Sequence, residues 1–221
     1  MTRELTVHRR EAQSGSARSA VMFLHGYGAD GKDLLGLADP LAPHMPDTMF
    51  IAPDAPDRSA MNPMGFQWSP IPWIDGSSEE EAEAAMARSI DNVNALVDRF
   101  LEDEGLTAAN LILFGFSQGT MLSLHLAPRR AESVAGVVGF SGRLLQPEKL
   151  EAEATVKPPI LLVHGDSDDV VPFASMSLAG DALTTAGFEV FGHVMKGTAH
   201  GIAPDGLSVA AAFMRDKLGI A

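Results

Sequence analysis

The sequence contains no cysteine, which excludes disulfide bonds, thiolate metal sites and a cysteine nucleophile together. Basic residues are also scarce: 16 Lys and Arg stand against 29 Asp and Glu, which gives a formal net charge of −13. A field of that sign repels phosphate backbones and anionic lipid surfaces, so we expect no nucleic-acid partner and no stable membrane association. A neutral or acyl substrate is not excluded.

Long hydrophobic runs are missing as well. No apolar stretch approaches the roughly 18 residues of a membrane span, and the opening M-T-R-E-L-T-V-H-R-R lacks the apolar core of a signal peptide. We therefore expect a cytoplasmic protein. Hydrophobic residues still make up 46% of the 221, enough for one substantial core, and a single domain over 1–221 is predicted.

Short apolar runs alternate with helical patterns along most of the chain. The central runs are continuously apolar, as strands covered on both faces are. This alternation predicts an α/β layer fold with a largely parallel sheet. The expected strands are Leu5–His8, Ala20–Leu24, Met49–Ala52, Leu111–Phe116, Val134–Phe140, Ile160–His164 and Val190–Met195.

The strongest helix signal runs from Ser77 to Glu104. A capping box of the S-x-x-E type opens it, formed either by Ser77 with Glu80 or by Ser78 with Glu81. Apolar side chains then recur at three- and four-residue steps and predict one buried stripe. That stripe is Met86, Ile90, Val93, Val97 and Phe100, with Gly105 as the stop, and further helices are expected after Ser117, over Phe173–Ala186 and over Gly206–Leu218.

The stretch V-M-F-L-H-G-Y-G-A-D-G contains a G-x-G-x-x-G formed by Gly26, Gly28 and Gly31. It is a formal match to a dinucleotide phosphate cradle, and the same residues could instead carry the backbone amides of a hydrolase oxyanion hole. A dinucleotide fold places its third glycine inside the helix, whereas Gly31 is expected to precede it. Asp54 stands at about the right distance for a ribose-binding acid. The dinucleotide interpretation nevertheless leaves the later motifs unexplained, so we favour the oxyanion turn.

A nucleophile motif, G-x-S-x-G, spans residues 115–119 around Ser117. The bare motif is weak, but an apolar run leads into it and T-M-L-S-L-H-L-A leads out of it as a helix. A nucleophile elbow needs this context, because its serine sits in a strained turn with glycine on both sides to relieve crowding. An ordinary glycine-rich turn is the alternative, and the context favours Ser117 as the nucleophile.

The acid and base of such an enzyme are expected after the elbow, in the order Ser, Asp, His. H-G-D-S-D-D-V-V-P follows a predicted strand and offers Asp166, Asp168 and Asp169. Adjacent side chains of an extended segment point to opposite sides, so only one of the last two can readily face the base. K-G-T-A-H-G follows the last predicted strand and places His200 in a glycine-bounded loop. Order and placement both fit a serine hydrolase.

The remaining histidines are interpreted as structural. His25 and His164 each end a predicted strand before a glycine, a position suited to hydrogen bonds with neighbouring loops. The D-S-D-D run lacks the spacing of a calcium loop, and no H-E-x-x-H pattern for zinc occurs. We expect neither a metal nor a cofactor.

One stretch, A-P-D-A-P-D-R-S-A-M-N-P-M-G-F-Q-W-S-P-I-P-W, has no steady period and predicts a long loop. Such loops are usually functional or disordered, and the aromatic residues weigh against disorder. The loop follows a predicted strand, so it should leave the carboxyl edge of the sheet, where ligands bind. We expect Met64, Phe66 and Trp68 to form an apolar wall beside Ser117, with an ordered structural cover as the alternative.

Taken together, these motifs resemble the phospholipase/carboxylesterase family of α/β-hydrolases. The resemblance starts near Ala20 and rests on F-L-H-G-Y-G-A-D-G, A-P-D-A-P-D-R, G-F-S-Q-G, H-G-D-S-D-D-V-V-P and G-T-A-H-G in that order. It implies an α/β-hydrolase fold without a large separate cap domain, no cofactor, and a possible homodimer, since many members are dimers. It also implies a triad of Ser117, Asp168 and His200, with backbone N–H groups of Tyr27 and Gln118 as the oxyanion hole.

Two departures from the family pattern bear on the substrate. Thr120 stands where many members have a second glycine after G-F-S-Q-G, and F-Q-W-S-P-I-P-W stands where thioesterase-type members carry W-F-D. The second change favours a bacterial carboxylesterase acting on esters of short to medium acyl chains. An acyl-protein thioesterase or a lysophospholipase is the alternative, and a non-catalytic binding protein on the same scaffold is a more distant one.

Overall fold

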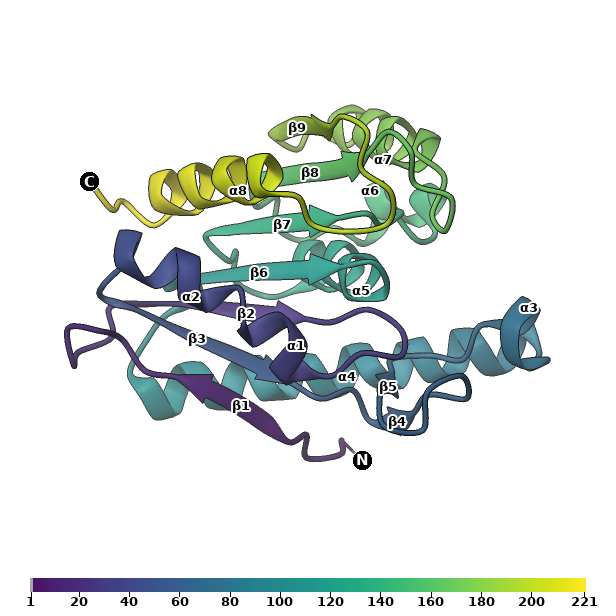
Figure 1. Cartoon of the computed structure of the whole chain (residues 1–221), viewed down its shortest axis with the longest axis horizontal. Helices are drawn as coiled ribbons and strands as arrows, with labels where there is room; N and C mark the ends of the chain where they lie inside the picture. Colours follow the sequence, from purple (N-terminus) through teal and green to yellow (C-terminus); the bar gives the residue numbers. More distant parts are fainter. Residues whose placement is uncertain (1) are drawn as a thin grey trace.

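The protein is described by a computed structural model covering residues 2–221, built around a seven-stranded sheet (Figure 1). The strand order is β1-β3-β2-β6-β7-β8-β9, in which β1 is antiparallel to β3 and the other neighbours are parallel. The predicted largely parallel α/β sheet is therefore confirmed. The strands are β1 (Val7–Arg10), β2 (Ser19–Leu24), β3 (Thr48–Pro53), β6 (Leu111–Phe116), β7 (Gly136–Phe140), β8 (Ile160–Gly165) and β9 (Val190–Met195).

Helices cover both faces of this sheet, because its strands are apolar on both sides. Along β2, Ala20 and Met22 pack into one core cluster, whereas Val21 and Phe23 pack into the other. The first cluster contains side chains of α4 (Glu79–Glu104), α5 (Gln118–Leu126), α6 (Leu150–Glu153) and α7 (Ala174–Thr185). The second contains side chains of α1 (Gly31–Leu35), α2 (Ala38–Leu41) and α8 (Pro204–Lys217).

The proline-rich segment is more regular than the sequence predicts. It contains a small hairpin in which β4 (Asp57–Arg58) pairs with β5 (Phe66–Gln67), and then a short helix, α3 (Pro72–Asp75). Figure 1 shows this segment, α3 and the start of α4 projecting beyond the carboxyl ends of the parallel strands. The expectation that this loop leaves the carboxyl edge of the sheet is confirmed, and the segment there covers the edge where α/β proteins bind ligands.

The capping box of α4 is the second of the two alternatives. The Ser78 hydroxyl accepts a hydrogen bond from the Glu81 amide at 3.1 Å, and the Glu81 carboxylate accepts one from the Ser78 amide at 2.8 Å. At the other end, Gly105 has a left-handed conformation (φ 65°) and ends the helix as predicted. A cap therefore determines each end of α4, and the position of the helix along the chain determines which of its side chains pack on α5.

We expect Ser78→Ala to lower the free energy of unfolding by about 1 kcal/mol, because the helix loses its N-terminal cap. Ser77→Ala is the matched control and should leave stability within about 0.5 kcal/mol, since the cap of α4 is formed by Ser78 and not by Ser77. Urea unfolding of both variants measures the difference. Equal losses would contradict the assignment of the cap to Ser78.

Candidate active site

Ser117 occupies the turn between β6 and α5 in a strained backbone conformation. Its φ of 54° and ψ of −114° lie where non-glycine residues are rarely found, and such strain costs on the order of 1–3 kcal/mol. Two backbone hydrogen bonds hold it: the Ser117 amide donates to the Phe140 carbonyl at 2.9 Å, and the Met121 amide donates to the Ser117 carbonyl at 3.2 Å. This geometry is the strained strand–turn–helix that the sequence predicts.

The glycines flanking Ser117 are required by close backbone contacts. A Cβ at Gly119 would lie 1.8 Å from the Leu24 carbonyl oxygen, and one at Gly115 would lie 2.4 Å from the Thr120 amide nitrogen. Any side chain at either position would push α5 away from β2 and β6. The start of α5 can therefore approach the sheet closely only with glycine at both places, which explains the motif physically.

Thr120, the departure from the family pattern, fills space behind the turn. Its hydroxyl donates to the Phe140 carbonyl at 2.7 Å, next to the bond that this carbonyl accepts from the Ser117 amide. A Cβ at Gly139 would lie 2.7 Å from the Thr120 methyl carbon, and a Cβ at Gly142 would lie 2.5 Å from it, so both positions need glycine. Thr120 thus braces the end of β7 against the turn without entering the space in front of Ser117.

Asp168 and His200 are hydrogen-bonded to each other. Oδ2 of Asp168 lies 2.8 Å from Nδ1 of His200, and Oδ1 accepts from the Val170 and Val171 amides at 3.0 and 2.9 Å. Burial by itself raises the pKa of the Asp168 carboxyl, but the bonds with His200 and the two amides outweigh it and hold that pKa below its usual value. Asp169 is exposed, so of the two neighbouring carboxylates only Asp168 contacts the imidazole.

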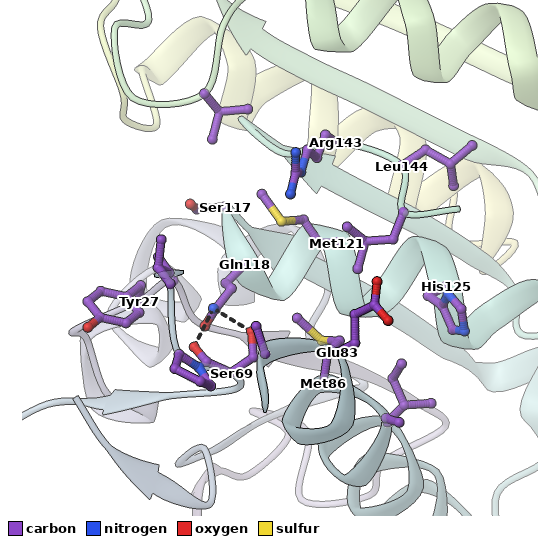
Figure 2. Close-up of a pocket in the computed structure, with 18 of the residues that line it drawn as sticks. Tyr27, Ser69, Glu83, Met86, Ser117, Gln118, Met121, His125, Arg143 and Leu144 are labelled. Carbon is purple, nitrogen blue, oxygen red and sulfur yellow. Dashed lines mark hydrogen bonds between the residues drawn. The ribbon is translucent and has the colours of Figure 1, made fainter. Parts of the chain in front are cut away.

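Ser117 and His200 line one cavity of about 940 Å³, together with Tyr27 and Gln118 (Figure 2). Gln118 is the first residue of α5, where backbone N–H groups have no partner within the helix. The Tyr27 amide belongs to the loop that follows β2, and Tyr27 lines the same cavity. The structure thus brings Ser117, His200 and the two residues of the predicted oxyanion hole to one cavity, and Asp168 contacts His200 from outside the lining.

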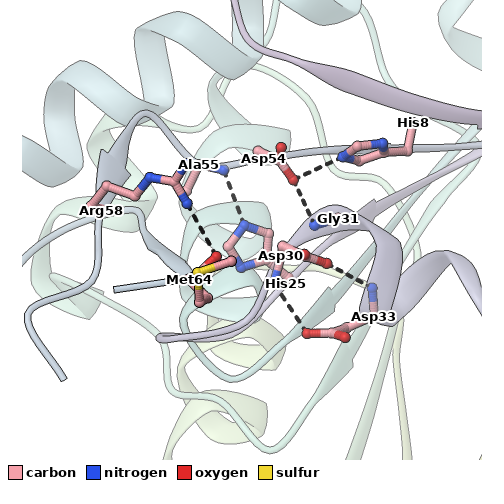
Figure 3. Close-up of polar contacts among 9 residues, drawn as sticks. All are labelled: His8, His25, Asp30, Gly31, Asp33, Asp54, Ala55, Arg58 and Met64. Atoms are coloured by element: carbon pink, nitrogen blue, oxygen red, sulfur yellow. Dashed lines mark hydrogen bonds and ion pairs between the residues drawn. The ribbon is translucent and has the colours of Figure 1, made fainter. Parts of the chain in front are cut away.

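His25 bonds the start of the loop that carries Tyr27 to Ala55, and Figure 3 shows the contact between His25 and the Ala55 amide. Its Nε2 accepts a hydrogen bond from the Ala55 amide at 3.0 Å, so Nδ1 carries the proton and donates to the Gly26 carbonyl at 2.7 Å. Burial lowers the pKa of His25, although the bond to the Gly26 carbonyl opposes the shift. The neutral imidazole therefore serves both of these bonds, in agreement with the structural role predicted from its position.

The position of Gly31 differs from the prediction, since it is the first residue of α1 and does not precede the helix. A Cβ there would lie 2.4 Å from the Ala52 carbonyl oxygen, so this glycine does allow close packing of helix on strand. That argument against a dinucleotide site was wrong. A better argument against a dinucleotide site is that the Asp54 carboxylate is buried and already bonded within the protein. Its Oδ1 accepts from the Gly31 amide at 2.9 Å and contacts His8 Nε2 at 3.1 Å, so it is not free to bind a ribose.

The predicted apolar wall of Met64, Phe66 and Trp68 does not line the cavity, and this expectation is corrected. Met64 is 80% exposed, and the Arg58 guanidinium stacks on the Phe66 ring at 4.1 Å. Trp68 is completely buried, and its indole Nε1 donates to the His25 carbonyl at 2.8 Å. The sequence indicates that these side chains must be covered, but not which neighbours cover them.

The residues that do form the walls come from several segments of the chain. The end of the proline-rich segment contributes a stretch that begins at Ser69, and the Gln118 side chain donates to the Ser69 carbonyl at 2.8 Å and to its hydroxyl at 3.0 Å. The part of α4 that follows its cap, α5 and the loops after β7 and β8 contribute the rest. The apolar residues of the lining include Pro70, Ile71, Trp73, Ile74, Met86, Ile90, Met121, Leu144 and Val171.

Sequence reasoning missed this wall, although two signals were present. The first is the second tryptophan, Trp73, which lies in the same proline-rich stretch as Trp68 and is 73% exposed in the structure. The second is the three- and four-residue spacing of Gln118, Met121 and His125, which places them on one face of the post-elbow helix. All four residues line the cavity.

The profile of the phospholipase/carboxylesterase family matches residues 7–218, which is nearly the whole chain. This chain belongs to the phospholipase/carboxylesterase family. Its fold is accordingly that of the α/β-hydrolases, and the esterase PE8, a solved structure with 40% sequence identity, superposes with a TM-score of 0.88. That likeness covers 97% of this chain and 100% of the esterase, and no large cap domain is added to the sheet.

Other members of the phospholipase/carboxylesterase family are similar over most of their length. Acyl-protein thioesterase 1 of Saccharomyces cerevisiae is 30% identical over 219 residues, with 91% of this chain and 94% of the yeast protein covered. A probable carboxylesterase of Oryza sativa subsp. japonica is 28% identical over 222 residues, with 94% of this chain and 80% of the rice protein covered. As a member of this family, the protein is a hydrolase.

Two further features of the described chain concern ions and membranes. Within residues 2–221, no group of three or more His, Asp or Glu side chains is placed to hold a metal ion. None of the helices in that range is both long and apolar enough to cross a bilayer.

The position of Trp68 predicts a structural effect of its substitution. Trp68→Phe removes the N–H group that bonds the buried His25 carbonyl, so we expect the free energy of unfolding to fall by about 1–3 kcal/mol. Activity should fall by one common factor on esters of every acyl length, because the loop after His25 shifts as a whole. Met64→Ala is the exposed control, with changes within about 0.5 kcal/mol. A loss that grows with acyl length would restore Trp68 to the substrate wall.

Proposed function

We propose that this hydrolase cleaves carboxylic esters of short- to medium-chain acids, with Ser117 as nucleophile, His200 as base and Asp168 as acid. The observation that carries the proposal is the 2.8 Å contact between Asp168 and His200, because His200 lines the same cavity as Ser117 in its strained turn. A triad accounts for both features: it explains why a serine is held in a strained turn, and why a carboxylate and an imidazole are hydrogen-bonded at the same cavity. Their joint placement supports a triad.

The proposed reaction has two acyl-transfer steps. His200 takes the Ser117 proton as the hydroxyl oxygen attacks the ester carbonyl, and Asp168 fixes the imidazole tautomer and stabilises the imidazolium that forms. The imidazolium then protonates the leaving alcohol as the carbon–oxygen bond breaks. Water repeats the sequence on the acyl-enzyme, which releases the acid and regenerates Ser117.

The oxyanion of each tetrahedral intermediate would accept hydrogen bonds from the Tyr27 and Gln118 amides. Each such donor is worth on the order of 10²–10³ in rate in other hydrolases. Two sets of contacts keep these donors fixed before substrate binds: His25 bonds the Gly26 carbonyl, and the Gln118 side chain bonds Ser69. This preorganisation supports the assignment, because amides that need not reorient stabilise developing charge most effectively.

The acyl group would lie in the groove between α4 and α5. Its apolar side chains, among them Ile71, Met86 and Met121, line the cavity that contains Ser117. Each acyl methylene buried there should contribute up to about 0.8 kcal/mol until the groove is full. A thioesterase acting on acylated proteins is a second candidate, favoured by the name of the yeast relative. Matched ester and thioester substrates of one acyl length would separate the two activities.

Location and assembly stay predictions from the sequence. The expected compartment is the cytoplasm, and a homodimer is allowed by the family resemblance.

The nucleophile assignment predicts that a fluorophosphonate labels Ser117 alone, because only a base-activated hydroxyl attacks phosphorus readily near neutral pH. Mass spectrometry of the digested protein locates the label. Ser117→Ala should abolish both labelling and hydrolysis while the protein stays folded by circular dichroism. A label elsewhere, or full esterase activity in Ser117→Ala, would overturn the serine-hydrolase proposal.

The acid assignment predicts unequal effects at two neighbouring carboxylates. Asp168→Asn should lower kcat by about 10⁴, because the imidazole loses its orienting partner and its preferred tautomer. Asp169→Asn, the control, should change kcat less than about twofold, since that side chain is exposed. Steady-state kinetics on one short-chain ester measures both. Equal losses would show that the acid has been misassigned.

A further inference from the structure

His164, in β8, is buried beside the proposed triad and takes no part in the reaction described above. Its side chain is 2% exposed, and its Nε2 lies 2.9 Å from the Val171 carbonyl oxygen and 3.2 Å from Oδ2 of Asp168. A carbonyl oxygen can only accept a hydrogen bond, so Nε2 carries the proton and donates to Val171. An N–H group of the sheet therefore lies against the carboxylate that contacts His200.

The hydrogen bond from His164 fixes the residue that binds Asp168. Val171 is buried, and its amide donates to Oδ1 of Asp168 at 2.9 Å while its carbonyl accepts from His164. Both polar groups of its backbone are thus engaged, one by the carboxylate and one by the strand. Because His164 belongs to β8, this bond ties the turn that holds Asp168 to the sheet.

Oδ2 of Asp168 meets two imidazoles. It lies 2.8 Å from Nδ1 of His200 and 3.2 Å from Nε2 of His164. The His164 N–H donates to the Val171 carbonyl, so its contact with Oδ2 is a favourable dipole–charge contact beside the shorter bond to His200. The Val170 and Val171 amides hold Oδ1. A buried carboxylate needs such partners to stay charged, and together they also fix the direction in which it faces His200.

His164 acts from outside the substrate cavity. Within residues 2–221, the cavity lining includes Val171 and His200 but not His164. The Phe173 ring packs edge-on against the His164 imidazole, with ring centroids 6.0 Å apart. A change at His164 should therefore alter the rate of the chemical steps and leave substrate binding almost unaffected.

We propose that His164 is a positioning residue: its Nε2–H group holds Val171 and lies against Asp168, which keeps that carboxylate aimed at the catalytic imidazole. This inference rests on the proposed function, because the orientation of Asp168 matters only if it is the acid of the triad. The structural role expected for this histidine from the sequence thereby has a consequence for the rate.

His164→Met tests the proposal, because methionine has a similar length and no N–H group. We expect kcat on a short-chain 4-nitrophenyl ester to fall by about 10- to 100-fold, since small displacements of a catalytic group have effects of this size. KM should stay within about twofold, because no contact with the substrate is lost. His164→Gln should keep kcat within about threefold of the unsubstituted protein, since its amide N–H groups can donate to the Val171 carbonyl. Equal kcat values in the two variants would overturn the proposal.

Thr48→Val is the matched control for loss of a buried hydrogen bond. The hydroxyls of Ser19 and Thr48 lie 2.8 Å apart, and both residues are buried. They begin β2 and β3, at the edge of the sheet opposite the site. This variant should lower the melting temperature, as His164→Met should, but change kcat by less than about twofold. A fall in kcat as large as that of His164→Met would show that lost stability explains both results.

A double-mutant cycle separates action through Asp168 from a wider effect on the fold. In the Asp168→Asn background, His164→Met should change kcat by less than about threefold, because the group that His164 positions is already lost. An equal fall in both backgrounds would show that His164 acts on the fold or on Ser117, and would overturn the proposal.

Two single variants test the proposed function by itself. If either Asp168→Asn or Ser117→Ala keeps the full rate, the triad assignment fails. If both lose activity while His164→Met retains it, only the positioning role of His164 is contradicted.

Discussion

The site depends on the close approach of α5 to the sheet at the two glycines around Ser117. The Leu24 carbonyl and the Thr120 amide leave no room for a Cβ at Gly119 or Gly115, so the chain must turn sharply there. That turn forces Ser117 into its strained conformation and places Gln118, the first residue of α5, at the cavity. The strain is local, and it persists because the parallel strands on both sides of β6 are buried and fixed.

Much of this arrangement could be predicted from the sequence, because its signals are local. The run leading into Ser117, the capping residues of α4 and the acidic segment after β8 each carry a pattern that short-range geometry explains. The starts of two strands were predicted less accurately. β1 begins at Val7 where Leu5 was predicted, and β7 begins at Gly136 where Val134 was predicted. Boundaries of this kind depend on which neighbouring strand supplies hydrogen bonds, and one strand's sequence does not contain that information.

The substrate wall could not be predicted, because the direction of side chains in an aperiodic segment is set by distant partners. Trp68 points into the core since its indole bonds the His25 carbonyl, its amide donates to the Gln118 side chain at 3.0 Å, and its carbonyl accepts from Ser89 at 2.5 Å. These partners come from three separate parts of the chain. Composition indicated an apolar contact surface, but only the folded structure shows that Trp73 belongs to the wall and Trp68 to the core.

The Gln118 side chain has a consequence for how such an enzyme can change its substrate. It joins the turn that carries Ser117 to Trp68 and Ser69 by hydrogen bonds. The apolar part of the wall that this segment supplies begins at the next residue, Pro70, and its Trp73 and Ile74 are exposed. Substitutions beyond Ser69 can therefore reshape the groove while the reacting atoms keep their positions, and selectivity can diverge between relatives without any repair of the catalytic geometry.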